Sequence, residues 1–311
     1  MLRLTQVIAS AAAAIALTAA AAVPAMAAPR TANVPKGEYY LSLGDSLSVG
    51  DQPRMSGVTL PTDAGYADQL HALLWKTDHD LQLVKLGCPG ETSVTLMKGG
   101  ICGYKGAHRF SLTGRTGNQL SAALAFLRFH PNGVPLITID IGANDVNACV
   151  TSMDLNKIIA CLTPVLPAIG KNLAVTLAKL HAAAPNATIV GMNYYVPELA
   201  AWLSGTSAGQ TFAAASITLD QTFSKVLAGA YATVKAPMAD VLTAFSTADM
   251  KDMVSLPPFP GKVPLDVARI CQWTWMCAPK PVGPNIHANR AGYAVIAKAF
   301  WAKISKIKNA F

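Results

Sequence analysis

The sequence has no internal repeat, no charged linker and no linker rich in glycine and serine. Charged residues make up only 14% of the 311 residues, whereas 52% are hydrophobic, so the chain can bury a large core. We therefore expect a single domain over residues 37–311, acting as a monomer. The lysines and arginines are scattered and are not grouped with aromatic residues, which argues against a nucleic acid as partner.

The common metal-binding motifs are also missing. No C-x-x-C occurs, no two histidines lie three to five residues apart, and no D-x-[DN]-x-[DN]-G loop is present. We therefore expect no metal and no cofactor.

The cysteines instead form three pairs that are close in sequence: Cys88 and Cys102, Cys149 and Cys161, and Cys271 and Cys277. An even count in an exported protein indicates disulfides, and of the many possible connectivities, sequential pairing closes the shortest loops.

The N-terminus has the pattern of a secretory signal. Arg3 precedes an uncharged, alanine-rich stretch over residues 8–26, which ends in Ala25-Met26-Ala27. We expect cleavage after Ala27, which gives a signal peptide over 1–27, a flexible segment over 28–36 and a secreted product. The alternative is a membrane anchor, because the stretch is nearly long enough to span a bilayer. Loss of Arg3 lowers the formal net charge from +8 to +7, so the secreted protein can contact anionic surfaces weakly.

Short apolar runs bounded by turn residues alternate with longer helical patterns. Strands are expected at residues 39–43, 81–86, 134–141 and 187–192, with a short fifth strand near 237–241. Helices are expected at 64–75, 117–129, 155–183, 208–234 and 289–308, the third with a break near Pro164 and Pro167. This alternation predicts an α/β fold with right-handed crossovers. Residues 247–286 lack a periodic element and are expected to form a disulfide-pinned loop.

Polar turns follow three of the expected strands directly. They are Gly44-Asp45-Ser46, Gly87-Cys88-Pro89-Gly90 and Gly142-Ala143-Asn144-Asp145. The carboxyl ends of parallel strands share one edge of a doubly wound sheet, and ligands bind in the crevice there. We therefore expect the three turns to meet and to form a binding site.

Ser46 is the candidate nucleophile of this crevice. Its hydroxyl can project into the crevice, whereas the alternative is a serine that caps a following helix. The G-x-S-x-G elbow of α/β-hydrolases is absent, because Ser48 stands where the second glycine would be. A serine hydroxyl also needs a neighbouring base to take its proton.

His287 is the candidate base. His130 and His181 fall near helix C-termini, where capping and the helix dipole explain them. His71 lies in an expected helix and His79 in a polar turn, which leaves the loop residue His108 as the second choice. His287 follows the long loop and precedes the last helix. The alternative for His287 is a polar residue at the start of that helix.

An oxyanion formed by attack on an ester needs hydrogen-bond donors that are fixed in advance. The N–H groups of Ser46 and Gly87 and the side-chain amide of Asn144 can supply three. The alternatives are a tight turn with positive φ for Gly87 and Gly90, and an Asx-turn for Asn144.

Together these segments resemble the SGNH (GDSL) hydrolase family. The shared features are GDS after the first strand, a glycine turn after the second, G-x-N-D after the third and a histidine near the C-terminus. The cysteine layout and the segment Ile270-Cys271-Gln272-Trp273-Thr274-Trp275-Met276-Cys277 are similar to the secreted three-disulfide lipase and esterase branch. The resemblance implies a three-layer α/β/α, flavodoxin-like fold with a doubly wound parallel sheet of about five strands. It also implies Ser46 as nucleophile, His287 as base, and Ser46, Gly87 and Asn144 as oxyanion donors.

One position departs from the family pattern. Most members have an aspartate three residues before the histidine, where this sequence has Pro284. We expect the main-chain carbonyl of Pro284 to accept a hydrogen bond from the imidazole Nδ1–H, which gives a Ser-His dyad. The alternative is a conventional triad with Asp266 or Asp252.

The expected activity is hydrolysis of a lipid or small-molecule carboxylic ester through an acyl-enzyme, phospholipid acyl esters included. The aromatic residues of the long loop and its surroundings either line an acyl groove or pack over a disulfide; they are Trp202, Phe259, Trp273 and Trp275, together with Met276. One alternative function is a polysaccharide O-acetyl esterase. Another, of a different class, is a secreted binding module that keeps the hydrolase fold without activity.

Overall fold

The computed structural model describes residues 39–104, 110–111 and 117–307. All of these belong to one compact unit, residues 32–311. The predicted signal peptide, the segment 28–36 and His108 lie outside the described residues.

Five parallel strands form the central sheet, in the order β4-β1-β7-β8-β9. Their bounds are Tyr39–Gly44 for β1, Gln82–Lys85 for β4, Leu136–Asp140 for β7, Thr188–Met192 for β8 and Met238–Ala239 for β9. Counted along the chain this is the order 2-1-3-4-5, which is the flavodoxin-like doubly wound topology. Because adjacent residues such as Tyr40 and Leu41 on β1, and Leu136 and Ile137 on β7, are all buried, both faces of the sheet must be covered.

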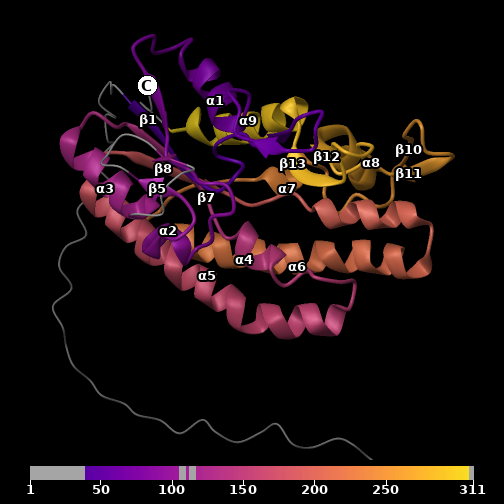
Figure 1. The fold of residues 1–311 in the computed structure, drawn as a ribbon. Coiled ribbons are helices and arrows are strands. Elements are labelled where there is room, and N and C mark those ends of the chain that lie inside the picture. The colour runs from indigo at the N-terminus through magenta and orange to yellow at the C-terminus, as the bar shows by residue number, and fades with distance from the viewer. Residues whose placement is uncertain (1–38, 105–109, 112–116, 308–311) are drawn as a thin grey trace, which may run out of the picture. The chain divides into compact units, whose positions relative to one another are not determined.

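Helices cover both faces of the sheet, which confirms the predicted three-layer α/β/α fold (Figure 1). One layer contains α1 (Tyr66–Leu74), α7 (Val241–Ala244), α8 (Leu265–Trp273) and α9 (Arg290–Ile304). The other contains α3 (Gln119–Phe129), α5 (Leu155–Ala183) and α6 (Ser207–Ala232). The ring of Tyr66 on α1 stacks on Phe300 of α9 at 4.8 Å between ring centroids, which joins two helices far apart in sequence.

Shorter elements complete the fold. Three short helices connect the layers: α2 (Thr95–Lys98), α4 (Ala143–Asn147) and the 3₁₀ helix η1 (Pro197–Ser204). Four antiparallel pairs lie outside the central sheet: β2 (Gln52–Pro53) with β3 (Thr59–Leu60), β5 (Gly103–Tyr104) with β6 (Phe110–Ser111), β10 (Met253–Ser255) with β11 (Lys262–Pro264), and β12 (Thr274–Trp275) with β13 (Asn285–Ala288).

Two sequence expectations are wrong. Helix α5 continues through Pro164 and Pro167 without a break. Both prolines lie on the exposed side of the helix, where water can satisfy the carbonyls that they leave without a donor. Residues 247–286 also contain α8 and two short strand pairings, which are too brief to give a periodic pattern.

Helix α5 is apolar enough to cross a membrane by length and composition, with a mean hydropathy of 1.6, but it packs here against α3, α4 and α6.

The cysteines pair in sequence order. Disulfides join Cys88 to Cys102, Cys149 to Cys161 and Cys271 to Cys277. Within the described residues no group of three or more His, Cys, Asp or Glu side chains is placed to hold a metal ion.

Gly44, at the end of β1, is required by its surroundings. Its φ is +136°, and a Cβ atom would lie 2.2 Å from the main-chain oxygen of Asp140. We expect Gly44→Ala to destabilise the protein by roughly 3 kcal/mol or more, from backbone strain and overlap combined. Urea unfolding measures this loss.

Gly229→Ala is the matched control, because Gly229 lies inside α6 and a Cβ there meets nothing within 4 Å. This change should stabilise the protein by roughly 0.5 to 1 kcal/mol. Equal urea midpoints for the two variants would contradict the argument.

Candidate active site

The turn after β1 is fixed by one buried side chain. The amide of Gln119, from α3, accepts a hydrogen bond from Gly44 N–H at 2.7 Å and donates one to the Gly44 carbonyl at 2.9 Å. Within the turn, Asp45 Oδ1 accepts from Leu47 N–H at 2.9 Å, and Ser48 Oγ donates to the Asp45 carbonyl at 2.7 Å. These bonds hold the backbone on both sides of Ser46.

Ser46 itself is left free to react. Its hydroxyl and its main-chain N–H have no hydrogen-bond partner among the described residues. The residues that follow form turns rather than a helix, so Ser46 is not a helix cap. A serine with an unused hydroxyl and an unused amide can serve both as nucleophile and as oxyanion donor.

The second turn lies directly against the first. Gly87 leaves no room for a side chain, because a Cβ atom would lie 1.7 Å from Ser48 Oγ. Its N–H also has no partner among the described residues, although Gly87 is not one of the residues that line the pocket described below. Cys88 N–H, next in sequence, donates to the Gly44 carbonyl at 3.1 Å.

The third turn is tied to the second by its two polar residues. Asn144, on α4, donates from Nδ2 to the Glu91 carbonyl at 2.9 Å, which leaves its second amide hydrogen available. Asp145 accepts from the N–H of Ser93 at 2.7 Å and from its hydroxyl at 2.8 Å. The side chain of Asn144 therefore bridges two loops and does not form a local Asx-turn.

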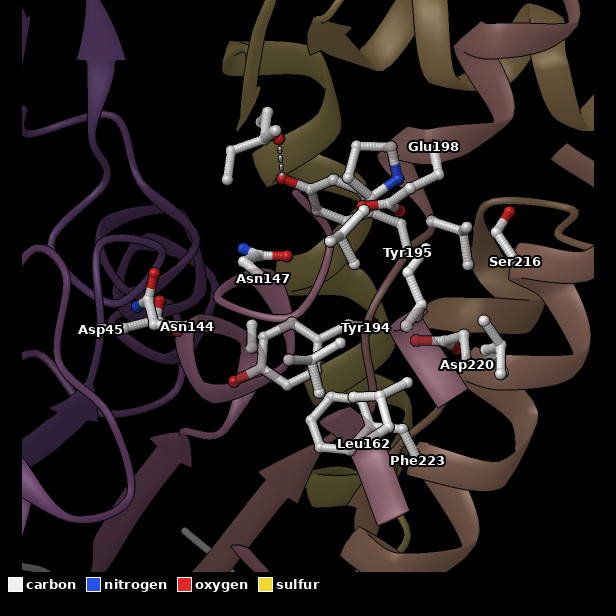
Figure 2. A pocket seen from close by; sticks show the side chains of 18 of the residues that line it. Asp45, Asn144, Asn147, Leu162, Tyr194, Tyr195, Glu198, Ser216, Asp220 and Phe223 are labelled. Atoms are coloured by element: carbon white, nitrogen blue, oxygen red, sulfur yellow. Dashed lines mark hydrogen bonds between the residues drawn. The ribbon is translucent and has the colours of Figure 1, made fainter. Parts of the chain in front are cut away.

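His287 lies on β13, which pairs with β12 in the region expected to be a loop. The helix that follows is capped by Asn289, whose side chain accepts from the N–H groups of Ala291 and Gly292, so His287 is not the capping residue. The hydroxyl of Tyr195 donates to the carbonyl of Ile286 at 2.7 Å and fixes the strand beside the imidazole (Figure 2). Burial lowers the pKa of His287 to about 4, so its imidazole is neutral at pH 7.

The partner of the imidazole differs from the expected one. Nδ1 lies 2.7 Å from Oδ1 of Asn285, and this oxygen also accepts from the His287 N–H at 3.0 Å. Neither the carbonyl of Pro284 nor the carboxyls of Asp252 and Asp266 form a hydrogen bond with His287 in the described part of the chain. The expectation for Pro284 was therefore wrong. An Asn side chain commonly accepts from the N–H two residues on, and this Asx-type spacing could have drawn attention to Asn285.

Three of the predicted site residues meet in one pocket. Ser46, Asn144 and His287 all line it, together with residues from α5, η1 and α6. Figure 2 shows Asn144 and Asp45 at one end of the pocket and Leu162 and Phe223 along its wall. No hydrogen bond joins the Ser46 hydroxyl to His287 within the described residues, as is common before substrate binds. The pocket continues between Ile158, Leu162 and Leu166 of α5 and Phe212, Leu219 and Phe223 of α6.

The aromatic residues proposed for an acyl groove do not line this pocket. Trp273 packs against Phe245 at 5.2 Å between ring centroids, and Arg269 lies 4.5 Å over its ring. Trp202, Phe259 and Met276 also pack against the core. The packing alternative therefore applies to Trp273, and the apolar lining comes from α5 and α6, which the sequence analysis did not connect with the site.

Two buried carboxyls lie beneath the Ser46 turn. Burial raises the pKa of Asp45 and of Asp140, and the proximity of Asp45 raises that of Asp140 further. The Tyr66 hydroxyl donates to Asp140, and Asp45 N–H lies 3.4 Å from the other carboxyl oxygen. Burial therefore favours the protonated form of both carboxyls, which lessens the negative charge beside the candidate nucleophile.

Comparison with solved structures shows the same fold in three hydrolases. A phospholipase A1 from Streptomyces albidoflavus aligns with a TM-score of 0.52 and 16% identity over 86% of this chain and 99% of that one. A putative GDSL-like lipase from Parabacteroides merdae aligns with a TM-score of 0.52 and 14% identity, over 86% of this chain and 95% of that one. A mutant acetyl-xylooligosaccharide esterase from Geobacillus aligns with a TM-score of 0.50 and 15% identity, over 87% of this chain and 95% of that one.

A search of curated proteins found no match. The model of the GDSL-like Lipase/Acylhydrolase family, in contrast, matches residues 42–295, a range that begins in β1 and ends in α9 and contains Ser46, Asn144 and His287. The chain therefore belongs to the GDSL-like lipase/acylhydrolase family.

Proposed function

We propose that this protein hydrolyses carboxylic esters through an acyl-enzyme on Ser46, with His287 as the general base. The observation that carries the proposal is the meeting of the Ser46 hydroxyl, the Asn144 amide and the His287 imidazole in one pocket. These groups come from three segments that are far apart in the sequence. The main-chain N–H groups of Ser46 and Gly87 also have no hydrogen-bond partner in the described residues, so both are available to donate to an oxyanion.

The proposed reaction begins with the neutral imidazole. Because Asn285 Oδ1 can only accept a hydrogen bond, Nδ1 carries the proton and Nε2 is left as the base. Nε2 takes the Ser46 proton as Oγ attacks the ester carbonyl carbon. The carbonyl oxygen becomes an oxyanion that accepts hydrogen bonds from the Ser46 and Gly87 N–H groups and from Asn144 Nδ2.

The imidazolium then returns its proton to the leaving alkoxide, and the alcohol departs from the acyl-enzyme. Water attacks the acyl-enzyme by the same route and releases the carboxylic acid. Asn285 orients the imidazole but is neutral, so it gives the imidazolium less support than an aspartate would. The low pKa of His287 agrees with the absence of a charged partner.

The apolar lining from α5 and α6 supports an acyl chain as part of the substrate. Three disulfides are typical of proteins that fold in an oxidising compartment, and they support export with a signal peptide over residues 1–27. A polysaccharide O-acetyl esterase is the alternative, and an inactive binding module is the second.

Loss of either reacting group should abolish turnover. We expect Ser46→Ala and His287→Ala each to lower kcat by about 10⁴-fold or more, because the two groups act as a unit. A fluorophosphonate probe should label the wild type and not Ser46→Ala. Release of p-nitrophenol from acetate, butyrate and octanoate esters measures the chain-length preference.

The exposed residues Ser207 and His181 provide matched controls, and their alanine variants should keep wild-type rates. Activity confined to the acetate ester would favour the O-acetyl esterase. A folded wild type that neither reacts with the probe nor releases p-nitrophenol would favour the binding module.

The pH dependence should report the low pKa of His287. The base form is the unprotonated one, so kcat/KM should rise with pH through about 4 and be level from pH 6 to 8. Asn285→Asp puts a carboxylate at Nδ1, which should raise the pKa of His287 and move the rise to higher pH. Asn285→Ala removes the orienting acceptor and should lower kcat by roughly 10- to 100-fold.

Circular dichroism at each pH ensures that the profile reports catalysis and not unfolding. If kcat/KM of the wild type instead rose with an apparent pKa near 6.5, and the two Asn285 variants gave the same apparent pKa, the assignment of Asn285 would be contradicted.

Tyr195 should act as a positioning residue. Tyr195→Phe keeps the ring that stacks on Phe245 at 4.6 Å but removes the hydrogen bond to the Ile286 carbonyl. We expect kcat to fall by roughly tenfold with little change in the urea midpoint, because the loss affects the placement of His287. A variant that loses stability but keeps kcat would show that Tyr195 serves only packing.

A further inference from the structure

The end of the pocket far from Ser46 is acidic. Figure 2 shows Asp45 and Asn144 at one end, and Glu198, Ser216 and Asp220 at the other. Glu198 lies in the first turn of η1 and Asp220 in the middle of α6. A pocket that held only an acyl chain would have no use for two carboxyls.

These carboxyls have no cationic partner. No lysine, arginine or histidine forms an ion pair with either of them in the part of the chain that the structure describes. The carboxyl of Glu198 interacts only with its own main-chain amide, and Asp220 accepts one long hydrogen bond, 3.4 Å from Ser224 Oγ. Burial raises the pKa of both, and the nearness of Glu198 contributes to raising that of Asp220 to about 8.

A third polar group in the same pocket is also unsatisfied. The hydroxyl of Tyr194 is buried without a hydrogen-bond partner in the described residues, although the side chain is only 4% exposed and lines the pocket. Buried polar groups in folded proteins are nearly always hydrogen-bonded, so the Tyr194 hydroxyl, which points toward Asp45 and Asn144 (Figure 2), indicates that a ligand occupies this pocket. The side chains of Tyr195, Phe212 and Phe223 line the same space and can offer aromatic faces to a cation.

We propose that the pocket takes an ester bearing a quaternary or protonated ammonium group, which lies between Glu198 and Asp220 among the aromatic side chains. This inference rests on the proposed function for the reacting end of the pocket. Either kind of ammonium ion supplies the positive charge that the two carboxylates lack and can lie against the aromatic and apolar walls, and a protonated one can also donate hydrogen bonds to the carboxylates. A divalent metal ion fits less well, because no third His, Cys, Asp or Glu ligand accompanies the pair in the described residues.

The preference for a cation should increase with pH. A carboxyl with a raised pKa attracts an ammonium ion only when it is ionised, so the preference should grow from pH 7 to pH 9. Helix α5 contributes only apolar lining residues. The titratable residues that line the pocket are Asp45, Tyr194, Tyr195, Glu198, Asp220 and His287. His287 affects charged and uncharged esters alike, so the ratio of their rates isolates the carboxyls.

Pairs of esters that differ only in charge test the inference. Butyrylcholine is compared with 3,3-dimethylbutyl butyrate, which places the charge on the alcohol side. The p-nitrophenyl esters of 4-trimethylammoniobutyrate and of 5,5-dimethylhexanoate place it on the acyl side. With EDTA present to exclude metal ions, we expect kcat/KM to be about tenfold higher for the cationic member of at least one pair.

Variants of the two carboxyls should remove this preference. Glu198→Gln, Asp220→Asn and the double variant should bring the cationic-to-neutral ratio toward one, whatever happens to the absolute rates. The matched control is Asp63→Asn, which removes an exposed carboxylate that has only a 3.7 Å surface contact with Lys85 and should leave the ratio unchanged. The double variant should also unfold at a higher temperature than the wild type, because unpaired buried carboxyls are removed.

A binding measurement separates this inference from the proposed function. Tetramethylammonium chloride, compared with sodium chloride, should raise the Tm of Ser46→Ala at pH 9 and should not do so when Glu198→Gln and Asp220→Asn are added. Equal rates within both ester pairs and no shift in Tm would overturn the inference and leave the esterase proposal intact. A shift that depends on the carboxyls, with no ester hydrolysed, would support the inference and overturn the proposed function.

Discussion

A short chain of buried hydrogen bonds holds the three turns of the candidate active site in position relative to one another. Gln119 binds both the N–H and the carbonyl of Gly44, and its Nε2 also donates to the carboxyl of Glu91 at 3.1 Å. The carbonyl of Glu91 in turn accepts from Asn144. Gln119 and Glu91 are fully enclosed, so a break in this chain would leave buried polar groups unpaired at a cost of about 1 to 3 kcal/mol each. The site therefore depends on residues that never touch the substrate.

The electrostatics around the site are set by neutral groups. Burial shifts Asp45 and Asp140 toward the protonated form, the His287 imidazole is neutral, and the side chain that accepts its hydrogen bond is the uncharged Asn285. Each of these choices follows from burial, since an isolated charge in an apolar environment is costly. At the far end of the pocket, burial likewise raises the pKa of Glu198 and Asp220, but these carboxyls have no cationic partner among the described residues and become charged as the pH rises. This contrast sets the two ends of the pocket apart.

The fold and most of the site could be predicted from the sequence, because both depend on local patterns. Apolar runs gave the sheet strands, and a polar turn after each of three strands placed Ser46, Gly87 and Asn144 at one edge. What could not be predicted depends on contacts between distant segments. Glu91 and Gln119 lie in unremarkable positions of the sequence, and the α5 and α6 residues that line the pocket follow ordinary helical periodicity.

Asn285 was missed for a different reason. The family pattern predicts an orienting group three residues before His287, whereas the Asx-type contact of Asn285 places a side-chain oxygen two residues before it at both the N–H and the Nδ1 of His287. The continuous helix through Pro164 and Pro167 shows the same limit, since the effect of a proline depends on whether its carbonyl neighbours face water.

The positions of the three disulfides relative to the site have one further consequence. Cys88 follows Gly87, Cys149 lies just after α4, and the bridge from Cys271 to Cys277 closes the loop between α8 and the strand that carries His287. The Cys88–Cys102 bridge lies within the apolar core, whereas none of the three bridges joins two strands of the central sheet. Oxidation of the thiols therefore constrains the loops around Ser46 and His287, while hydrogen bonds between strands and burial of apolar side chains hold the sheet itself.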